Sequence, residues 1–168
     1  MRLLALLALA LLGALVPLAA CAPAIPPLAD TRESPAGVAQ AVIDAMTAGD
    51  ARALSSLALS ESEFRHHVWP ELPAARPERN LPFSYVWGDL RQKSGASLGA
   101  SLARHRGQRY TLVDVRFGEA TPYDTYTVHR DSTFVVRAQD GQQQDLRLCG
   151  SMIEQHGRWK VFSYVVDN

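Results

Sequence analysis

The hydrophobic period of this sequence changes once along its length, and that change constrains the fold more than any other feature. Between residues 34 and 59 the apolar side chains recur at helical spacing, and they form the stripe Val38, Ala41, Val42, Ala45 and Met46. From Arg109 onward apolar and polar side chains alternate with the period of two that strands require. Helices followed by consecutive strands predict an α+β domain, with N-terminal helices packed on an antiparallel sheet.

Local start and stop signals place the first helices. Ser34 followed by Pro35 is typical of a helix N-terminus. Gly49 is expected to end the first helix, because glycine readily adopts the left-handed conformation found there. Asp50 is expected to cap a second, short helix over residues 51–59.

The middle of the chain is less regular. The turn Ser60-Glu61-Ser62-Glu63 begins another helical segment, which carries Phe64, Val68 and Trp69. Prolines then interrupt regular structure up to residue 82. A third helix is expected from residue 81 or 82 to Gly107, with Gly95 and Gly99 weakening its second half.

The strands follow in order. The first is expected over residues 110–117, and a long second one over residues 123–138, with a bend or bulge at the polar patch 129–132. Asp140-Gly141 predicts a hairpin turn into a third strand around residues 146–152. His156-Gly157 turns the chain again into a closing strand over residues 158–166.

The N-terminus has the pattern of a secretory signal peptide. Met1-Arg2 is positive, residues 3–16 are apolar apart from Gly13, and Pro17 precedes a run of small residues. The alternative is a transmembrane helix, which needs about 20 apolar residues. The apolar run here is shorter, and a proline-rich stretch follows it.

The sequence Leu18-Ala19-Ala20-Cys21 resembles the lipobox of bacterial lipoproteins. In that family the cysteine receives a thioether-linked diacylglycerol, the peptide bond before it is cut, and in many bacteria the new amine is acylated. The resemblance implies lipid attachment at Cys21 and a membrane as partner. Because Ala22 rather than Asp follows, it also implies the outer membrane, facing the periplasm, in a Gram-negative host. The alternative is an ordinary signal peptide whose exit holds a cysteine.

These features predict three regions. Residues 1–20 are the lipoprotein signal peptide, residues 21–33 are the lipidated cysteine with a proline-rich tether, and residues 34–168 are a single domain. The whole chain has 17 basic and 17 acidic side chains, so no net field favours nucleic acid as a partner. Cys149 is the remaining cysteine, and a buried, inert thiol is the expected state.

Two segments resemble the nuclear-transport-factor-2-like superfamily. One is the opening Val38-Ala39-Gln40-Ala41-Val42-Ile43-Asp44-Ala45-Met46-Thr47-Ala48-Gly49-Asp50, with an Ala-Gly-Asp junction, and the other is the ending Gly157-Arg158-Trp159-Lys160-Val161-Phe162-Ser163-Tyr164. The resemblance implies a cone-like fold, in which a curved sheet wraps around helices and leaves a pocket at the open end. Members of that superfamily use the pocket for catalysis or ligand binding, or fill it with side chains.

Three residues are candidates for contact with a ligand in such a pocket. Trp87 lies on the third helix, Tyr126 lies on the second strand, and Asp114 lies on the first strand beside Tyr110 and Leu112. The opposite face of that strand, with Val113, is more apolar, so Asp114 is expected to face solvent. For Trp87, simple core packing is the alternative.

No catalytic residue, metal site or cofactor is predicted. The tandem pair His66-His67 cannot easily share one metal, because neighbouring side chains point in different directions on a helix or a strand. No phosphate-binding loop or nucleophile elbow is present in the sequence.

The closing strand is apolar on both faces, with Trp159 and Val161 on one side and Phe162 and Tyr164 on the other. One face is expected to meet the helices. The second would meet a partner, either a second copy of the chain or an envelope protein, or would be covered by residues 60–82.

Together these patterns predict a membrane-anchored envelope lipoprotein with a non-catalytic role in binding a ligand or a protein. The alternative is a small acid–base enzyme, isomerase-like or cyclase-like, acting on a hydrophobic ligand in the cone pocket. A pKa-shifted carboxylate paired with His or Tyr inside the pocket would favour the enzyme.

Overall fold

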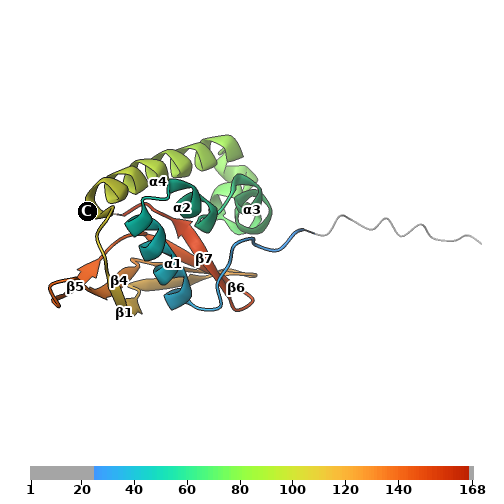
Figure 1. The fold of residues 1–168 in the computed structure, drawn as a ribbon. Coiled ribbons are helices and arrows are strands. Elements are labelled where there is room, and N and C mark those ends of the chain that lie inside the picture. The colour runs from blue at the N-terminus through green and yellow to red at the C-terminus, as the bar shows by residue number, and fades with distance from the viewer. Residues whose placement is uncertain (1–24, 167–168) are drawn as a thin grey trace, which may run out of the picture.

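The computed structural model describes residues 25–166, so the signal peptide and Cys21 lie outside the described residues. It shows the predicted α+β class, with helices lying over antiparallel strands (Figure 1). Among the helices in residues 25–166, none combines the length and the apolar character that a membrane span requires.

The first two helices begin and end at local signals. Helix α1 spans Pro35–Ala48, and its N-cap Ser34 accepts a hydrogen bond from the Gly37 amide at 3.1 Å. Gly49 ends it with a φ of 69°, the left-handed conformation that glycine tolerates best. Helix α2 spans Ala51–Leu57, two residues shorter than predicted, because Leu59 already donates its amide to the Val161 carbonyl.

Short helical turns fill residues 60–82. They are α3 (Glu61–Glu63), the π-helical η1 (Phe64–Val68) and the 3-10 turns η2 (Trp69–Glu71), η3 (Pro73–Ala75) and η4 (Pro77–Arg79). Each 3-10 turn has a proline in its first two positions, where the missing amide costs nothing. Helix α4 then runs unbroken over Phe83–His105, through Gly95 and Gly99.

The strands form two sheets rather than one. A three-stranded sheet has the order β1-β4-β5, and a four-stranded sheet has the order β2-β3-β6-β7. Their bounds are β1 Thr111–Arg116, β2 Glu119–Pro122, β3 Thr127–Arg130, β4 Thr133–Arg137, β5 Gln143–Leu146, β6 Ser151–Gln155 and β7 Arg158–Ser163. All pairings are antiparallel.

The bend predicted at residues 129–132 is present, and it divides the expected long strand. Asp131 adopts a positive φ of 52°, and β3 and β4 on either side of it pair in different sheets. The Asp131 carboxylate holds the Arg147 guanidinium at 2.7 Å. Across the same corner, the Ser132 amide donates to the Gly150 carbonyl at 3.2 Å. The expected third strand is divided in the same region, between β5 and β6.

Strand β1 contains a bulge that alternation did not predict. The register against β4 shifts between Leu112 and Asp114, so Leu112 and Val115 both pack on the core. Val113 is 48% exposed, and its predicted place on the apolar face is therefore wrong. Asp114 is exposed, as expected, and accepts a hydrogen bond from the Val115 amide.

Two clusters of buried side chains hold the layers together. The first lies between α1 and the strands and includes Ile43, Met46, Phe134 and Val161. The second lies beneath the start of α4, where Phe64 and Val68 of η1 meet Ile153 of β6 and Tyr126, which lies just before β3 and not on a strand as predicted. The ring centroid of Phe162 on β7 lies 6.2 Å from that of Phe64, so η1 packs against part of this side of the closing strand.

The proline-rich segment lies against the domain from residue 26, not apart from it as a tether. Leu28 is buried in the second cluster. Arg32 and Trp159 exchange two backbone hydrogen bonds of 2.8 Å, which extends the edge of the four-stranded sheet by one bridge. The domain therefore begins before Ser34.

Candidate functional site

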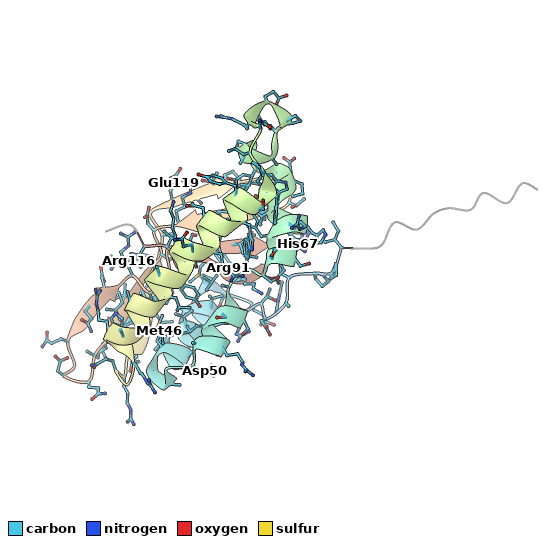
Figure 2. The ribbon with its side chains drawn as sticks, turned by 90° about the horizontal axis from the view of Figure 1, so that it is seen from above. Met46, Asp50, His67, Arg91, Arg116 and Glu119 are labelled. Carbon is cyan, nitrogen blue, oxygen red and sulfur yellow. The ribbon has the colours of Figure 1, made fainter. Side chains whose placement is uncertain are left out.

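A hollow among the described residues lies around β7, and α4 lines part of it. Three adjoining cavities of about 350, 310 and 470 Å³ share Phe162 of β7 in their walls. We call these cavities together the α4 groove. Figure 2 shows α4 crossing the molecule from above, with Arg91 near its middle.

Apolar side chains from three segments line the cavity of about 350 Å³, which is the apolar part of the groove. On α4, Trp87, Leu90 and Leu98 fall on one stripe and point toward the sheet. Leu59, just after α2, and Phe162 form the opposite wall. No side chain of α4 is fully buried, because the helix faces this hollow over much of its inner face.

Two polar side chains in this part of the groove have hydrogen-bond partners within the domain. Ser94 accepts a hydrogen bond from the Tyr164 amide at 3.0 Å. The Tyr164 hydroxyl donates to the Leu54 carbonyl at 2.7 Å, and burial raises the pKa of this phenol well above its ordinary value. The tyrosine is therefore a neutral structural donor at physiological pH.

Charged groups line the other two cavities. Asp89 pairs with Lys93 at 2.8 Å on α4, and Asp131 pairs with Arg147 at 2.7 Å at the sheet corner. Arg130 lines the same end of the groove. The groove is thus apolar in the middle and charged at its rim, which suits an amphiphilic molecule.

The predicted ligand contacts lie in different places. Trp87 lines the groove, with its ring 5.3 Å from that of Phe64. Tyr126 is 3% exposed, donates its hydroxyl to the Val68 carbonyl at 3.3 Å, and lines none of the described cavities. Asp114 lies on β1 in the other sheet. The structure therefore brings Trp87 and Tyr126 into one cluster and leaves Asp114 outside it.

Sequence reasoning missed several residues of the groove, among them Phe162 and Leu98. Phe162 was recognised only as part of a strand that is apolar on both faces. It lies where the pairing of β7 with β6 shifts register between Val161 and Ser163, and alternation does not predict such a shift. Leu98 comes after Gly95, where the sequence predicted a weakened helix, yet it continues the stripe of Trp87 and Leu90. A count of the helical period through the glycines would have found it.

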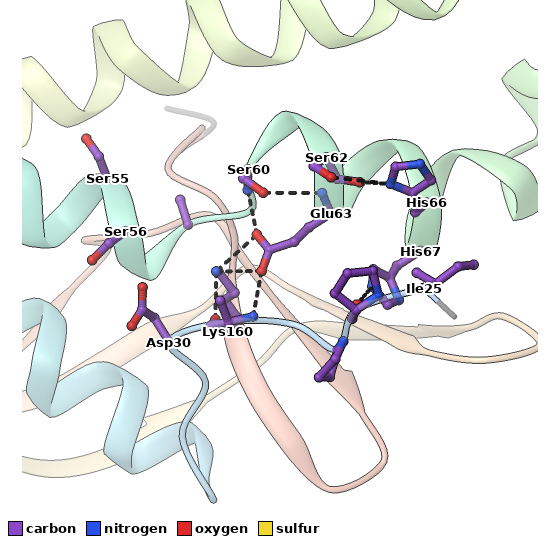
Figure 3. Close-up of a pocket in the computed structure, with 14 residues that line it drawn as sticks. Ile25, Asp30, Ser55, Ser56, Ser60, Ser62, Glu63, His66, His67 and Lys160 are labelled. Carbon is purple, nitrogen blue, oxygen red and sulfur yellow. Dashed lines mark hydrogen bonds and ion pairs between the residues drawn. The ribbon is translucent and has the colours of Figure 1, made fainter. Parts of the chain in front are cut away.

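Apart from the α4 groove, a cavity of about 290 Å³ lies where the N-terminal segment meets α3 (Figure 3). Its centre is a buried ion pair between Glu63 and Lys160, with N···O distances of 2.9 and 3.1 Å. Glu63 also accepts the amides of Ala29 and Ser60, at 2.8 and 2.7 Å. Lys160 donates in addition to the Ala29 carbonyl at 2.8 Å. We call the contacts among Ala29, Ser60, Glu63 and Lys160 the N-terminal clamp.

Hydrogen bonding outweighs burial at this carboxylate. Burial raises the pKa of Glu63, but the Ser60 amide, Lys160 and the Ala29 amide lower it by more, so the net pKa lies below its ordinary value. Glu63 is therefore charged at neutral pH.

The tandem histidines beside the clamp face different partners. His66 Nδ1 lies 2.8 Å from the Ser62 carbonyl, and His67 Nε2 donates to the Pro26 carbonyl at 2.8 Å. Within residues 25–166 no cluster of three or more side chains could hold a metal ion. Of the two histidines, His67 contacts the N-terminal segment, and His66 contacts its own helical turn.

Comparison with known proteins gave no match: no family model, no curated protein and no solved structure matches this chain.

Proposed function

We propose that this chain is an envelope lipoprotein, anchored through Cys21, whose domain binds an apolar or amphiphilic small molecule in the α4 groove. The observation that carries the binding role is the meeting of three cavities at Phe162, with Trp87, Leu90 and Leu98 above it. Each cavity has the size of a small-molecule site. The cone-like arrangement of the nuclear-transport-factor-2-like superfamily stays part of this proposal; helices over antiparallel strands with a hollow beside them fit it, and the division into two sheets departs from its single curved sheet.

The anchor is supported by the sequence Leu18-Ala19-Ala20-Cys21 at the end of an apolar run. Two or more acyl chains on one cysteine hold a protein on a membrane stably, since each buried methylene contributes about 0.8 kcal/mol. With Ala22 after the cysteine, we assign the protein to the outer membrane, facing the periplasm, in a Gram-negative host.

The rim of the groove favours binding over acid–base catalysis. A general acid or base works best when burial and neighbours bring its pKa near neutrality. Asp89 and Asp131 are exposed to solvent and paired with Lys93 and Arg147, so neither is a desolvated group placed inside the apolar part of the groove. The second face of the closing strand carries Phe162, so we assign this face to the ligand and not to a partner protein.

A fluorescent apolar probe tests the binding role. We would titrate 1-N-phenylnaphthylamine into a soluble chain that begins at residue 22, and we expect saturable binding. Leu98→Trp should fill the groove and weaken the binding of the probe by about tenfold, equivalent to about 1.4 kcal/mol. Ala100→Trp adds the same group on the exposed side of α4 and is the matched control. The absence of saturable binding, or equal affinity in both variants, would contradict the proposal.

A further inference from the structure

The N-terminal segment is held to the domain at four successive points. His67 binds the Pro26 carbonyl, Leu28 is buried, Ala29 lies in the N-terminal clamp, and Arg32 pairs with Trp159. These contacts come from backbone groups, an apolar side chain and a charged pair, so they do not depend on one kind of interaction. Residues 26–32 are therefore part of the domain surface.

The clamp makes this attachment costly to break. Lys160 is 3% exposed and Glu63 is 9% exposed. Lifting the segment away would remove the Ala29 amide and carbonyl from two buried charges, and an unsatisfied buried charge is strongly unfavourable. The segment should stay docked under conditions in which the domain is folded.

This docking shortens the connection to Cys21. Four residue steps separate residue 21 from residue 25, and a fully extended chain covers at most about 15 Å over that length. A free connection from residue 21 to residue 33 would reach about 45 Å by the same measure. A domain of this size is roughly 35–40 Å across, so a 15 Å connection is shorter than the domain itself. A lipid on Cys21 would therefore hold one end of the domain against the bilayer.

That end presents apolar side chains to solvent. Figure 1 places α3 and the start of α4 at the end of the molecule where residue 25 leaves the domain. Ile25 is 55% exposed, Leu81 is 41% exposed and Tyr85 is 66% exposed. They are three of the four large apolar side chains that are exposed within residues 25–166. We call these residues, together with residues 65–80, the anchor-proximal end.

Its polar side chains suit the same environment. Arg65 lies over the Phe83 ring at 3.6 Å, and Arg76 and Arg79 are exposed on the 3-10 turns. Tyrosine and tryptophan favour the boundary between headgroups and acyl chains, and long arginine side chains reach the phosphates while their stems remain apolar. Chain length, apolar exposure and side-chain chemistry thus indicate one occupant, a phospholipid surface.

We propose that the anchor-proximal end docks on the phospholipid bilayer in a fixed orientation, with Ile25, Leu81 and Tyr85 in the headgroup region. This inference rests on the proposed lipid anchor at Cys21. The hairpin between β4 and β5, at the opposite end of the molecule in Figure 1, then points away from the membrane.

Site-specific quenching tests the orientation on the full lipidated chain. The protein is purified from membranes, its acyl mass is verified, and it is reconstituted into phosphatidylethanolamine–phosphatidylglycerol vesicles with a nitroxide on some headgroups. A bimane label is attached at Arg79→Cys in one sample and at Gln139→Cys in another, since Cys149 is buried and does not compete. We expect strong quenching of the label at position 79 and little or no quenching of the label at position 139.

Two variants separate surface contact from the anchor. In the protein labelled at position 79, Leu81→Asp with Tyr85→Asp should reduce quenching, while Val113→Asp, an equally exposed apolar site in the β1 bulge, should not. All three side chains are exposed, so folding is preserved. Equal quenching at positions 79 and 139 in a protein that carries its acyl chains would overturn the orientation and leave the anchor standing. A mass without acyl chains would overturn the anchor, and the orientation with it.

Discussion

Replacing Lys160 by methionine is the sharpest test of the N-terminal clamp. The change removes the ammonium group and keeps most of the side chain's length. It deletes three hydrogen bonds, two to Glu63 and one to the Ala29 carbonyl. Glu63 is left buried without its counter-charge, and breaking a buried pair in this way costs about 3–5 kcal/mol. Because the amides of Ala29 and Ser60 still bind Glu63, we expect the lower end, about 3 kcal/mol.

Urea unfolding followed by far-UV circular dichroism measures this cost on the chain that begins at residue 22. The double variant Glu63→Gln with Lys160→Met should be more stable than Lys160→Met alone, because the buried charge is gone. The pKa of Glu63 is lowered in the folded state, so the pair stabilises fully above the ordinary pKa of about 4.3. This contribution is lost as the pH falls through the lower, folded value. A cost below about 1 kcal/mol at pH 7, the level of an exposed pair, would show that the Glu63–Lys160 pair does not hold the folded state as a buried pair does.

Three further outcomes follow from the packing. Gly150→Ala should destabilise the domain by about 1–3 kcal/mol in urea unfolding, because its new methyl group would overlap the Val165 carbonyl and displace the chain there. Gly95→Ala, on α4 with nothing within 4 Å, should instead stabilise by about 0.5–1 kcal/mol in urea, and destabilisation would show that α4 needs glycine there. Burial raises the pKa of Cys149 to about 12, so a thiol reagent at pH 8 should leave it unmodified until urea unfolds the domain. Rapid modification of the native protein would contradict that burial.

The helix boundaries were predictable because their causes are local. Ser34 and Asp50 cap their helices through side-chain contacts only three residues away, and Gly49 ends α1 through its own φ. The bend at residues 129–132 was likewise marked by polar residues inside an alternating strand. The alternation of polar and apolar residues does not show that β3 and β4 belong to different sheets. Sheet membership depends on the strands with which each one pairs, and these lie elsewhere in the chain.

The features that sequence reasoning missed depend on distant contacts. One extra residue, Val113, shifts the inward face of β1, and no local pattern marks such a bulge. Residues 26–33 looked like a tether because they have no hydrophobic period, yet Lys160 and Trp159, more than 120 positions away, hold them in place. Trp87 lines the groove as its place on the helical stripe suggested, whereas Asp114, expected to face solvent, lies on β1 in the other sheet.

We propose that Cys21 carries the lipid that brings this domain to a membrane. The intact mass of the detergent-extracted mature protein is the measurement that decides this. We predict the mass of residues 21–168 plus acyl chains. A mass equal to the bare chain, or to a chain that still carries residues 1–20, would contradict the claim.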